Sequence, residues 1–134
     1  MVLLDVDNYT YEKMMEYLNR LTLHLSVYPF IFKHVIGNSV MGKSINELQI
    51  GSGTKEVHVN GSFHANEWIT APVILRFLNQ YALSLTNNIP IRGLFVLPLY
   101  NATKLSLVPM VNPDGVNLVI NGALSAENHR QEVL

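Results

Sequence analysis

A histidine and a glutamate three residues apart, His64 and Glu67, are the residues of this chain whose types and spacing could do chemistry. Zinc accepts imidazole nitrogen and carboxylate oxygen at about 2.0 to 2.2 Å, and side chains three apart in a turn or at a helix start lie on one face. The pair could therefore supply half of a zinc site. Because a His-x-x-Glu pair also arises often by chance, its meaning depends on the elements that position it.

The pair lies where a strand is expected to give way to a helix. Residues 55–63 alternate apolar and polar side chains with the period of a pleated strand. Downstream, Thr70 offers an N-cap hydroxyl, Pro72 suits a first helical turn, and apolar residues recur at helical spacing over residues 71–85. Since open α/β sheets bind ligands beyond the carboxyl ends of their strands, His64 is expected at a position suited to chemistry.

A second motif, Asn112-Pro113-Asp114-Gly115, follows an apolar run over residues 104–111 that we interpret as a strand. Asn at the first position, Pro fixing φ at the second, Asp at the third and Gly at the fourth suit a type I turn. We interpret the motif as a chain reversal, which makes Asp114 a poor candidate for chemistry.

Together the two motifs resemble the zinc carboxypeptidase family, in which a His-x-x-Glu pair on a strand-to-helix turn is followed by a strand ending in Asn-Pro-Asp-Gly. The resemblance covers nearly the whole chain, and its most specific part is His-Ala-Asn-Glu-Trp-Ile-Thr at residues 64–70. Within the family, residues 108–119 look most like the bacterial γ-D-glutamyl-L-diamino acid endopeptidases, which cut cell-wall peptides.

The resemblance implies a zinc-dependent peptidase with Zn²⁺ held by His64, Glu67 and a later histidine, and with a later glutamate as general base. Glu67 is then a ligand and not the base. The family's remaining working residues lie beyond Leu134, and His129 and Arg130 fall in a polar tail, residues 123–134, that lacks the family's downstream pattern. We interpret His129 as a solvated tail residue.

Composition predicts missing cover for the sheet. The chain is 49% hydrophobic and 14% charged, whereas soluble domains carry about 25% charged residues. We therefore expect an α/β fold that is a truncated, amino-terminal portion of a zinc-carboxypeptidase-like mixed sheet with flanking helices, in one unit over residues 1–134. An exposed sheet edge and apolar patch, and hence self-association, are expected.

The expected elements form one α/β series without repeats. A helix over 10–26 precedes a hairpin of strands 32–36 and 45–50, then the strand before His64 and the helix over 71–85. Near-continuous apolar runs at 94–99 and 105–111 predict buried strands, and 116–120 a short extended piece. The crossover helix after His64 implies parallel neighbours.

The net charge and the amino-acid composition exclude or disfavour several classes of function. A net charge of −1 without a basic run argues against nucleic acid and anionic membrane as partners, and the lack of cysteine excludes thiolate chemistry. The start of the chain does not resemble a secretory signal, and no apolar stretch is long enough for a membrane helix. A cytoplasmic location, or a cell-wall-associated parent, is expected.

The other histidines and the tryptophan have structural interpretations. His24 and His34 are expected to be surface or hydrogen-bonded residues, and His58 lies about 20 Å from His64 along an extended strand, too far to share a metal. Trp68 is expected to be a packing anchor.

We therefore predict a zinc metallopeptidase in the full-length parent that hydrolyses peptide or peptidoglycan-peptide substrates. This chain is expected to be inactive alone, because two protein ligands are too few for a catalytic zinc site. Two alternatives stay open. One is a non-catalytic carboxypeptidase-like binding or regulatory module, and the other is a structural α/β domain in which His64 and Glu67 only hydrogen-bond to each other.

Overall fold

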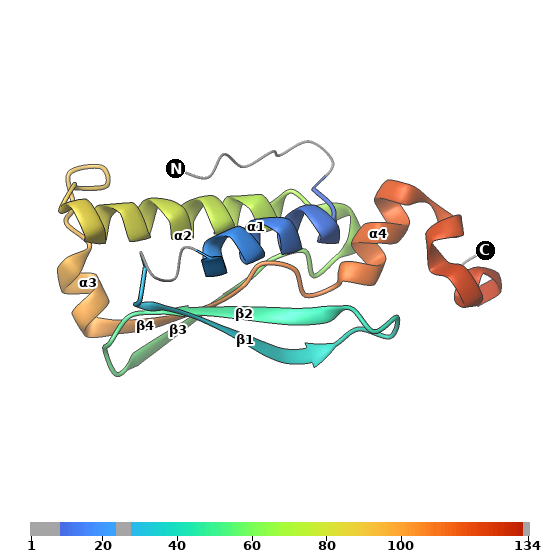
Figure 1. Cartoon of the computed structure of the whole chain (residues 1–134), viewed down its shortest axis with the longest axis horizontal. Coiled ribbons are helices and arrows are strands. Elements are labelled where there is room, and N and C mark those ends of the chain that lie inside the picture. The colour runs from blue at the N-terminus through green and yellow to red at the C-terminus, as the bar shows by residue number, and fades with distance from the viewer. Residues whose placement is uncertain (1–8, 24–27, 133–134) are drawn as a thin grey trace.

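The computed structural model describes residues 9–23 and 28–132. A four-stranded mixed sheet of order β1-β2-β4-β3 lies beneath the long helices, with the last two helical segments beyond one end of it (Figure 1). The elements are α1 (Tyr11–Leu23), β1 (Ile31–Asn38), β2 (Ser44–Ile50), β3 (Lys55–Asn60), η1 (Ala65–Glu67), α2 (Thr70–Asn87), α3 (Leu97–Ala102), β4 (Thr103–Val108), α4 (Pro113–Asn121) and η2 (Ala123–Glu132).

The core forms where the apolar face of the sheet meets α1 and α2. Alternate residues of β2 and β4 are buried because successive side chains of a strand point to opposite faces. The largest fully buried side chains of the strands and the two helices are Tyr81, Met14, Leu18, Ile31, Leu48, Ile50, Leu75, Leu78 and Leu107. Figure 1 shows these helices on one face only, so the opposite face of the sheet is open in the part of the chain that is described.

The expected α/β architecture is confirmed. Strands β1 and β2 form the antiparallel hairpin, with a register shift between Val35 and Gly37. Strand β3 pairs in parallel with β4, as the crossover helix required. The first helix begins at Tyr11; its expected end at residues 24–26, and His24, lie outside the described residues.

The prediction of a buried strand over residues 94–99 is wrong. Leu97–Ala102 form the short helix α3, and Leu94 and Phe95 are 74% and 54% exposed. Pro98 in the first turn explains the difference, because proline has no N–H for a sheet ladder but suits a helix start. Strand β4 begins only at Thr103.

The prediction of an extended piece over residues 116–120 is also wrong. Residues Pro113–Asn121 form helix α4, and the expected type I turn is its beginning. The side-chain oxygen of Asn112 accepts a hydrogen bond from the Gly115 N–H, which caps the helix, and Pro113 occupies its first turn.

The polar tail continues as a 3-10 helix, η2, beside α4. Ala126 is buried and His129 is partly buried. The interpretation of His129 as a solvated residue is therefore corrected, because η2 folds back instead of extending into solvent. None of the helices in the described ranges is long and apolar enough to cross a membrane.

Candidate metal site

The candidate pair is carried by a strand end that the neighbouring strand holds. Beyond β3, the Gly61 N–H donates to the Val108 carbonyl, and the Val111 N–H donates to the Gly61 carbonyl, both at 3.0 Å. The Asn112 N–H then donates to the Ser62 carbonyl at 3.0 Å. The two chain segments that leave β3 and β4 thus stay hydrogen-bonded, and His64 follows at the carboxyl end of β3 as expected.

The Thr70 hydroxyl braces the turn from the other side. Thr70 Oγ1 accepts a hydrogen bond from the Ser62 N–H at 2.6 Å and donates one to the Glu67 carbonyl at 2.7 Å. The residue in the N-cap position of α2 is Ile69, which makes no side-chain cap. The expected N-cap role of Thr70 is therefore wrong, because its hydroxyl is engaged by the turn that precedes the helix.

The turn brings His64 and Glu67 together. Residues Ala65–Glu67 form one 3-10 turn, closed by a hydrogen bond of 3.1 Å from the Glu67 N–H to the His64 carbonyl. His64 Nδ1 and Glu67 Oε1 are 3.0 Å apart, and the two side chains are 72% and 47% exposed. Two ligands at tetrahedral zinc lie about 3.3 Å apart, so this separation fits a shared ion after a small movement.

The chemistry of the two donors also fits zinc, whereas their number alone does not complete a site. Neutral imidazole and carboxylate are both zinc ligands, and both side chains are open to solvent at a strand end. Within residues 9–23 and 28–132, no group of three or more His, Cys, Asp or Glu side chains could hold a metal ion. A third protein ligand is thus not supplied by the described residues.

The other histidines occupy different places. On the open face of the sheet, His58 Nδ1 lies 2.9 Å from Ser106 Oγ, and His34 is an exposed residue of β1. His129 lines a separate cavity of about 280 Å³ between the β1–β2 turn, α4 and η2. Trp68 is partly buried and packs against the core, which agrees with its expected role as an anchor.

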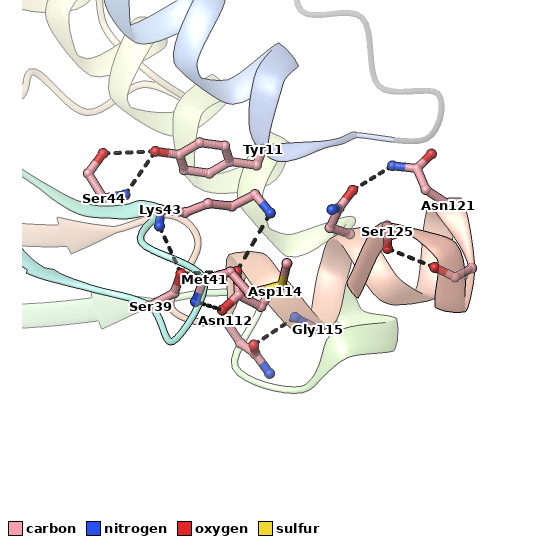
Figure 2. Close-up of polar contacts among 12 residues, drawn as sticks. Tyr11, Ser39, Met41, Lys43, Ser44, Asn112, Asp114, Gly115, Asn121 and Ser125 are labelled. Atoms are coloured by element: carbon pink, nitrogen blue, oxygen red, sulfur yellow. Dashed lines mark hydrogen bonds and ion pairs between the residues drawn. The ribbon is translucent and has the colours of Figure 1, made fainter. Parts of the chain in front are cut away.

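The Asn112-Pro113-Asp114-Gly115 motif was expected to reverse the chain, but its aspartate also holds a neighbouring loop. Asp114 accepts hydrogen bonds from Ser39 Oγ and from the Met41 N–H, each at 3.0 Å, and its carboxylate lies 3.6 Å from Lys43 Nζ (Figure 2). These contacts tie the tip of the β1–β2 hairpin to the first turn of α4. No sequence pattern indicated these contacts, because Ser39 and Lys43 lie more than 70 residues from Asp114.

The start of α4 also contacts the turn that carries His64 and Glu67. Asn112 Nδ2 donates to the Phe63 carbonyl at 3.4 Å, next to His64. The Phe63 ring in turn packs edge-on against the His64 imidazole, with ring centroids 5.8 Å apart. Asn112 therefore joins the Asp114 contacts to the candidate site.

A third carboxylate lies on the open face of the sheet. Ser106 Oγ donates to Glu47 at 2.5 Å, and Gln49 Nε2 donates to the same carboxylate at 3.0 Å. The hydrogen bond from Ser106 is the largest cause that holds the pKa of Glu47 below its usual value, with smaller contributions from Gln49, His34 and His58 against an opposing effect of burial. This polar row stabilises an ionised carboxylate away from the His64 turn.

The chain is similar in sequence to known zinc carboxypeptidases. The sequence profile of the zinc carboxypeptidase family matches residues 14–133. The chain belongs to this family. It is 54% identical over 127 residues to gamma-D-glutamyl-L-diamino acid endopeptidase 1 of Lysinibacillus sphaericus. The aligned region covers 95% of this chain and 31% of that protein. The chain is also 32% identical over 92 residues to carboxypeptidase E of Caenorhabditis elegans, covering 63% of this chain and 19% of that protein.

Solved structures agree with the fold. Carboxypeptidase A from Helicoverpa armigera superposes with a TM-score of 0.60 at 24% identity, over 82% of this chain and 26% of that one. Bovine thrombin-activatable fibrinolysis inhibitor superposes with a TM-score of 0.61 at 20% identity, over 79% and 32%. The chain thus spans about a third, or less, of the length of these relatives.

Proposed function

We propose that this chain is the part of a zinc-dependent peptidase that supplies two of the zinc ligands, His64 and Glu67. The observation that carries the proposal is the 3.0 Å approach of His64 Nδ1 to Glu67 Oε1 on a braced turn at the end of β3. Membership in the zinc carboxypeptidase family supports the choice of metal. The zinc when bound lowers the pKa of a water molecule and polarises the scissile carbonyl.

The residues of this chain would act by binding and orientation. The His64 imidazole must be neutral to bind a metal, and the Glu67 carboxylate contributes negative charge. Glu67 therefore acts as a ligand rather than as the base, because a carboxylate that is bound to the metal is not free to take the proton of the water. The base and the third ligand belong to the remainder of a whole catalytic domain.

The proposed substrate is a γ-D-glutamyl-diamino acid bond of a cell-wall peptide. Identity of 54% to the Lysinibacillus endopeptidase supports this substrate over a general peptide. Such a substrate would be met at the cell wall, or in the cytoplasm as a recycled fragment. Self-association is a further part of the proposal, because β3 is an outer strand of the sheet and Val59, Leu94 and Phe95 are exposed.

The first experiment measures zinc. Metal-stripped wild-type chain and His64→Ala are re-equilibrated with zinc, and bound metal is measured by mass spectrometry and by titration calorimetry. We expect weak binding by the wild type and its loss in His64→Ala, because one of the two ligands is then missing. His58→Ala is the matched control, since His58 lies on another face. Equal zinc in wild type and His64→Ala contradicts the proposed metal role.

The second experiment tests catalysis in a full-length parent that carries these residues. His64→Ala and Glu67→Ala are each assayed for hydrolysis of a γ-D-glutamyl-diamino acid peptide. We expect both to lose zinc-dependent activity. Retained activity in His64→Ala contradicts the assignment, and zinc binding without hydrolysis favours the non-catalytic binding module.

A further inference from the structure

The two ends of the turn that carries His64 and Glu67 are joined by the Thr70 side chain, and by longer hydrogen bonds from the Ser62 hydroxyl. The Thr70 hydroxyl accepts from the Ser62 N–H at 2.6 Å and donates to the Glu67 carbonyl at 2.7 Å. Ser62 lies two residues before His64, and Glu67 is the other candidate ligand. The Thr70 hydroxyl therefore fixes the separation between the strand end that carries the imidazole and the residue that carries the carboxylate.

The backbone that Thr70 holds is unusual. Ser62 has a φ of +50°, in the left-handed region that residues other than glycine adopt at a cost. Its side chain is fully buried, and its hydroxyl lies 3.4 Å from the Glu67 carbonyl oxygen and 3.5 Å from that of Trp68. Such a conformation persists only where neighbours determine it, and Thr70 is the neighbour that binds its N–H.

Thr70 packs closely against the strand end at Gly61. A Cβ added to Gly61 would lie 2.9 Å from Thr70 Oγ1, and equally close to Ile74 Cδ1 and the Pro109 carbonyl oxygen. The hydroxyl is thus placed by close contact with the strand end as well as by its two hydrogen bonds. Loss of the hydroxyl alone would free Ser62 to relax without changing the volume of the site.

We propose that Thr70 is a positioning residue for the His64–Glu67 pair, which rests on the proposed zinc role of that pair. It touches neither the metal nor a substrate, and it acts by holding the two ligand-bearing segments at the separation that lets both side chains reach one ion. Residues that orient metal ligands in this way change metal affinity by about 10- to 100-fold when they are removed.

The test compares three variants by zinc titration calorimetry on the whole chain. Thr70→Val keeps the shape and removes the hydroxyl, Thr70→Ser keeps the hydroxyl, and Thr103→Val is the matched control. Thr103 is 6% exposed and donates a comparable hydrogen bond of 2.8 Å to the Leu99 carbonyl, but it lies at the opposite end of the sheet's parallel strands. We expect zinc affinity about tenfold lower or more in Thr70→Val, and wild-type affinity in Thr70→Ser and Thr103→Val.

A second measurement works without metal. In metal-free protein, nuclear Overhauser contacts between the His64 ring protons and the Glu67 side chain are expected in wild type and Thr70→Ser, and are expected to be lost in Thr70→Val. Thermal unfolding followed by circular dichroism checks that all variants are folded at the temperature of both measurements.

The outcomes separate the two proposals. Wild-type contacts and wild-type zinc affinity in folded Thr70→Val overturn the positioning role. If zinc binds equally to wild type and His64→Ala, the proposed metal role fails, and the metal-free contacts still decide whether Thr70 positions the pair. Equal loss of zinc in Thr103→Val would also overturn the proposal, because the effect would then follow general destabilisation.

Discussion

Two carboxylates at the same end of the sheet have opposite surroundings. Glu67 follows β3, and Asp114 follows the neighbouring parallel strand β4. The Asp114 side chain is 19% exposed and is held by Ser39, Met41 and Lys43. The Glu67 side chain is 47% exposed and its carboxylate pairs with the imidazole of His64.

The difference separates a structural carboxylate from one that is free for chemistry. The charge of Asp114 is satisfied by an N–H, a hydroxyl and an ammonium group, so little of its binding capacity is left for a ligand. The charge of Glu67 faces an imidazole that can itself bind a metal. Geometry at this end of the sheet is therefore held by Asp114, and metal binding is the proposed role of Glu67.

Removal of Asp114 should give the largest change in stability. Asp114→Ala leaves the Met41 N–H and Lys43 without their acceptor, so the free energy of unfolding should fall by about 2–3 kcal/mol. Urea unfolding measures the change, and Asp114→Asn is the control that keeps the shape. An unchanged midpoint would show that the hairpin tip is held by other contacts.

Removal of the helix cap Asn112, which also contacts the segment before His64, should lower stability less. Asn112→Ala removes the acceptor for the Gly115 N–H and should cost about 1 kcal/mol. Asn117→Ala changes a side chain of the same helix that accepts a hydrogen bond from Asn121, and we expect it to change the free energy of unfolding by no more than about 0.5 kcal/mol. Similar losses in both variants would argue against a special role for the cap.

Substitution of Glu67 should leave stability nearly unchanged. Because exposed ion pairs contribute little, Glu67→Gln should change the free energy of unfolding by less than about 1 kcal/mol. Zinc binding, in contrast, should be lost. Calorimetry and urea unfolding on the same sample give both quantities, and a large loss of stability would place Glu67 with Asp114 as a structural residue.

A third carboxylate, Glu47, should make stability depend on pH, because its pKa is lowered in the folded protein. Its pKa is lowered in the folded protein from the usual 4.5, so its ionised form stabilises the fold above that value, and this contribution is lost as pH falls through the lowered pKa. Ser106→Ala removes the largest cause and should raise the pKa of Glu47 toward 4.5. Carbon-detected NMR titration of the Glu47 carboxyl measures the shift, with Ser44→Ala as the control. No shift in Ser106→Ala would contradict the assigned cause.

Local patterns predicted much of the fold because their causes are local. The alternation before His64, the helical spacing of residues 71–85 and the parallel pairing implied by the crossover were all confirmed. Residues 94–99 and 116–120 were predicted wrongly because apolar content outweighed local signals. Pro98 favoured a helix start in one segment, and the Asn112 cap started a helix in the other.

The sequence by itself determined the chemical types at the site, since an imidazole and a carboxylate three residues apart at a strand-to-helix junction follow from residue order. Only the tertiary structure decided how that junction is held. The contacts of Asp114 with the β1–β2 turn join residues more than 70 positions apart and depend on strand pairing and helix placement. The Ser62–Thr70–Glu67 brace is local in sequence, but the strand end that it holds is fixed by hydrogen bonds to β4 and the segment after it. Hydrogen bonds between such segments form only after the chain has packed, so no local sequence pattern specifies them.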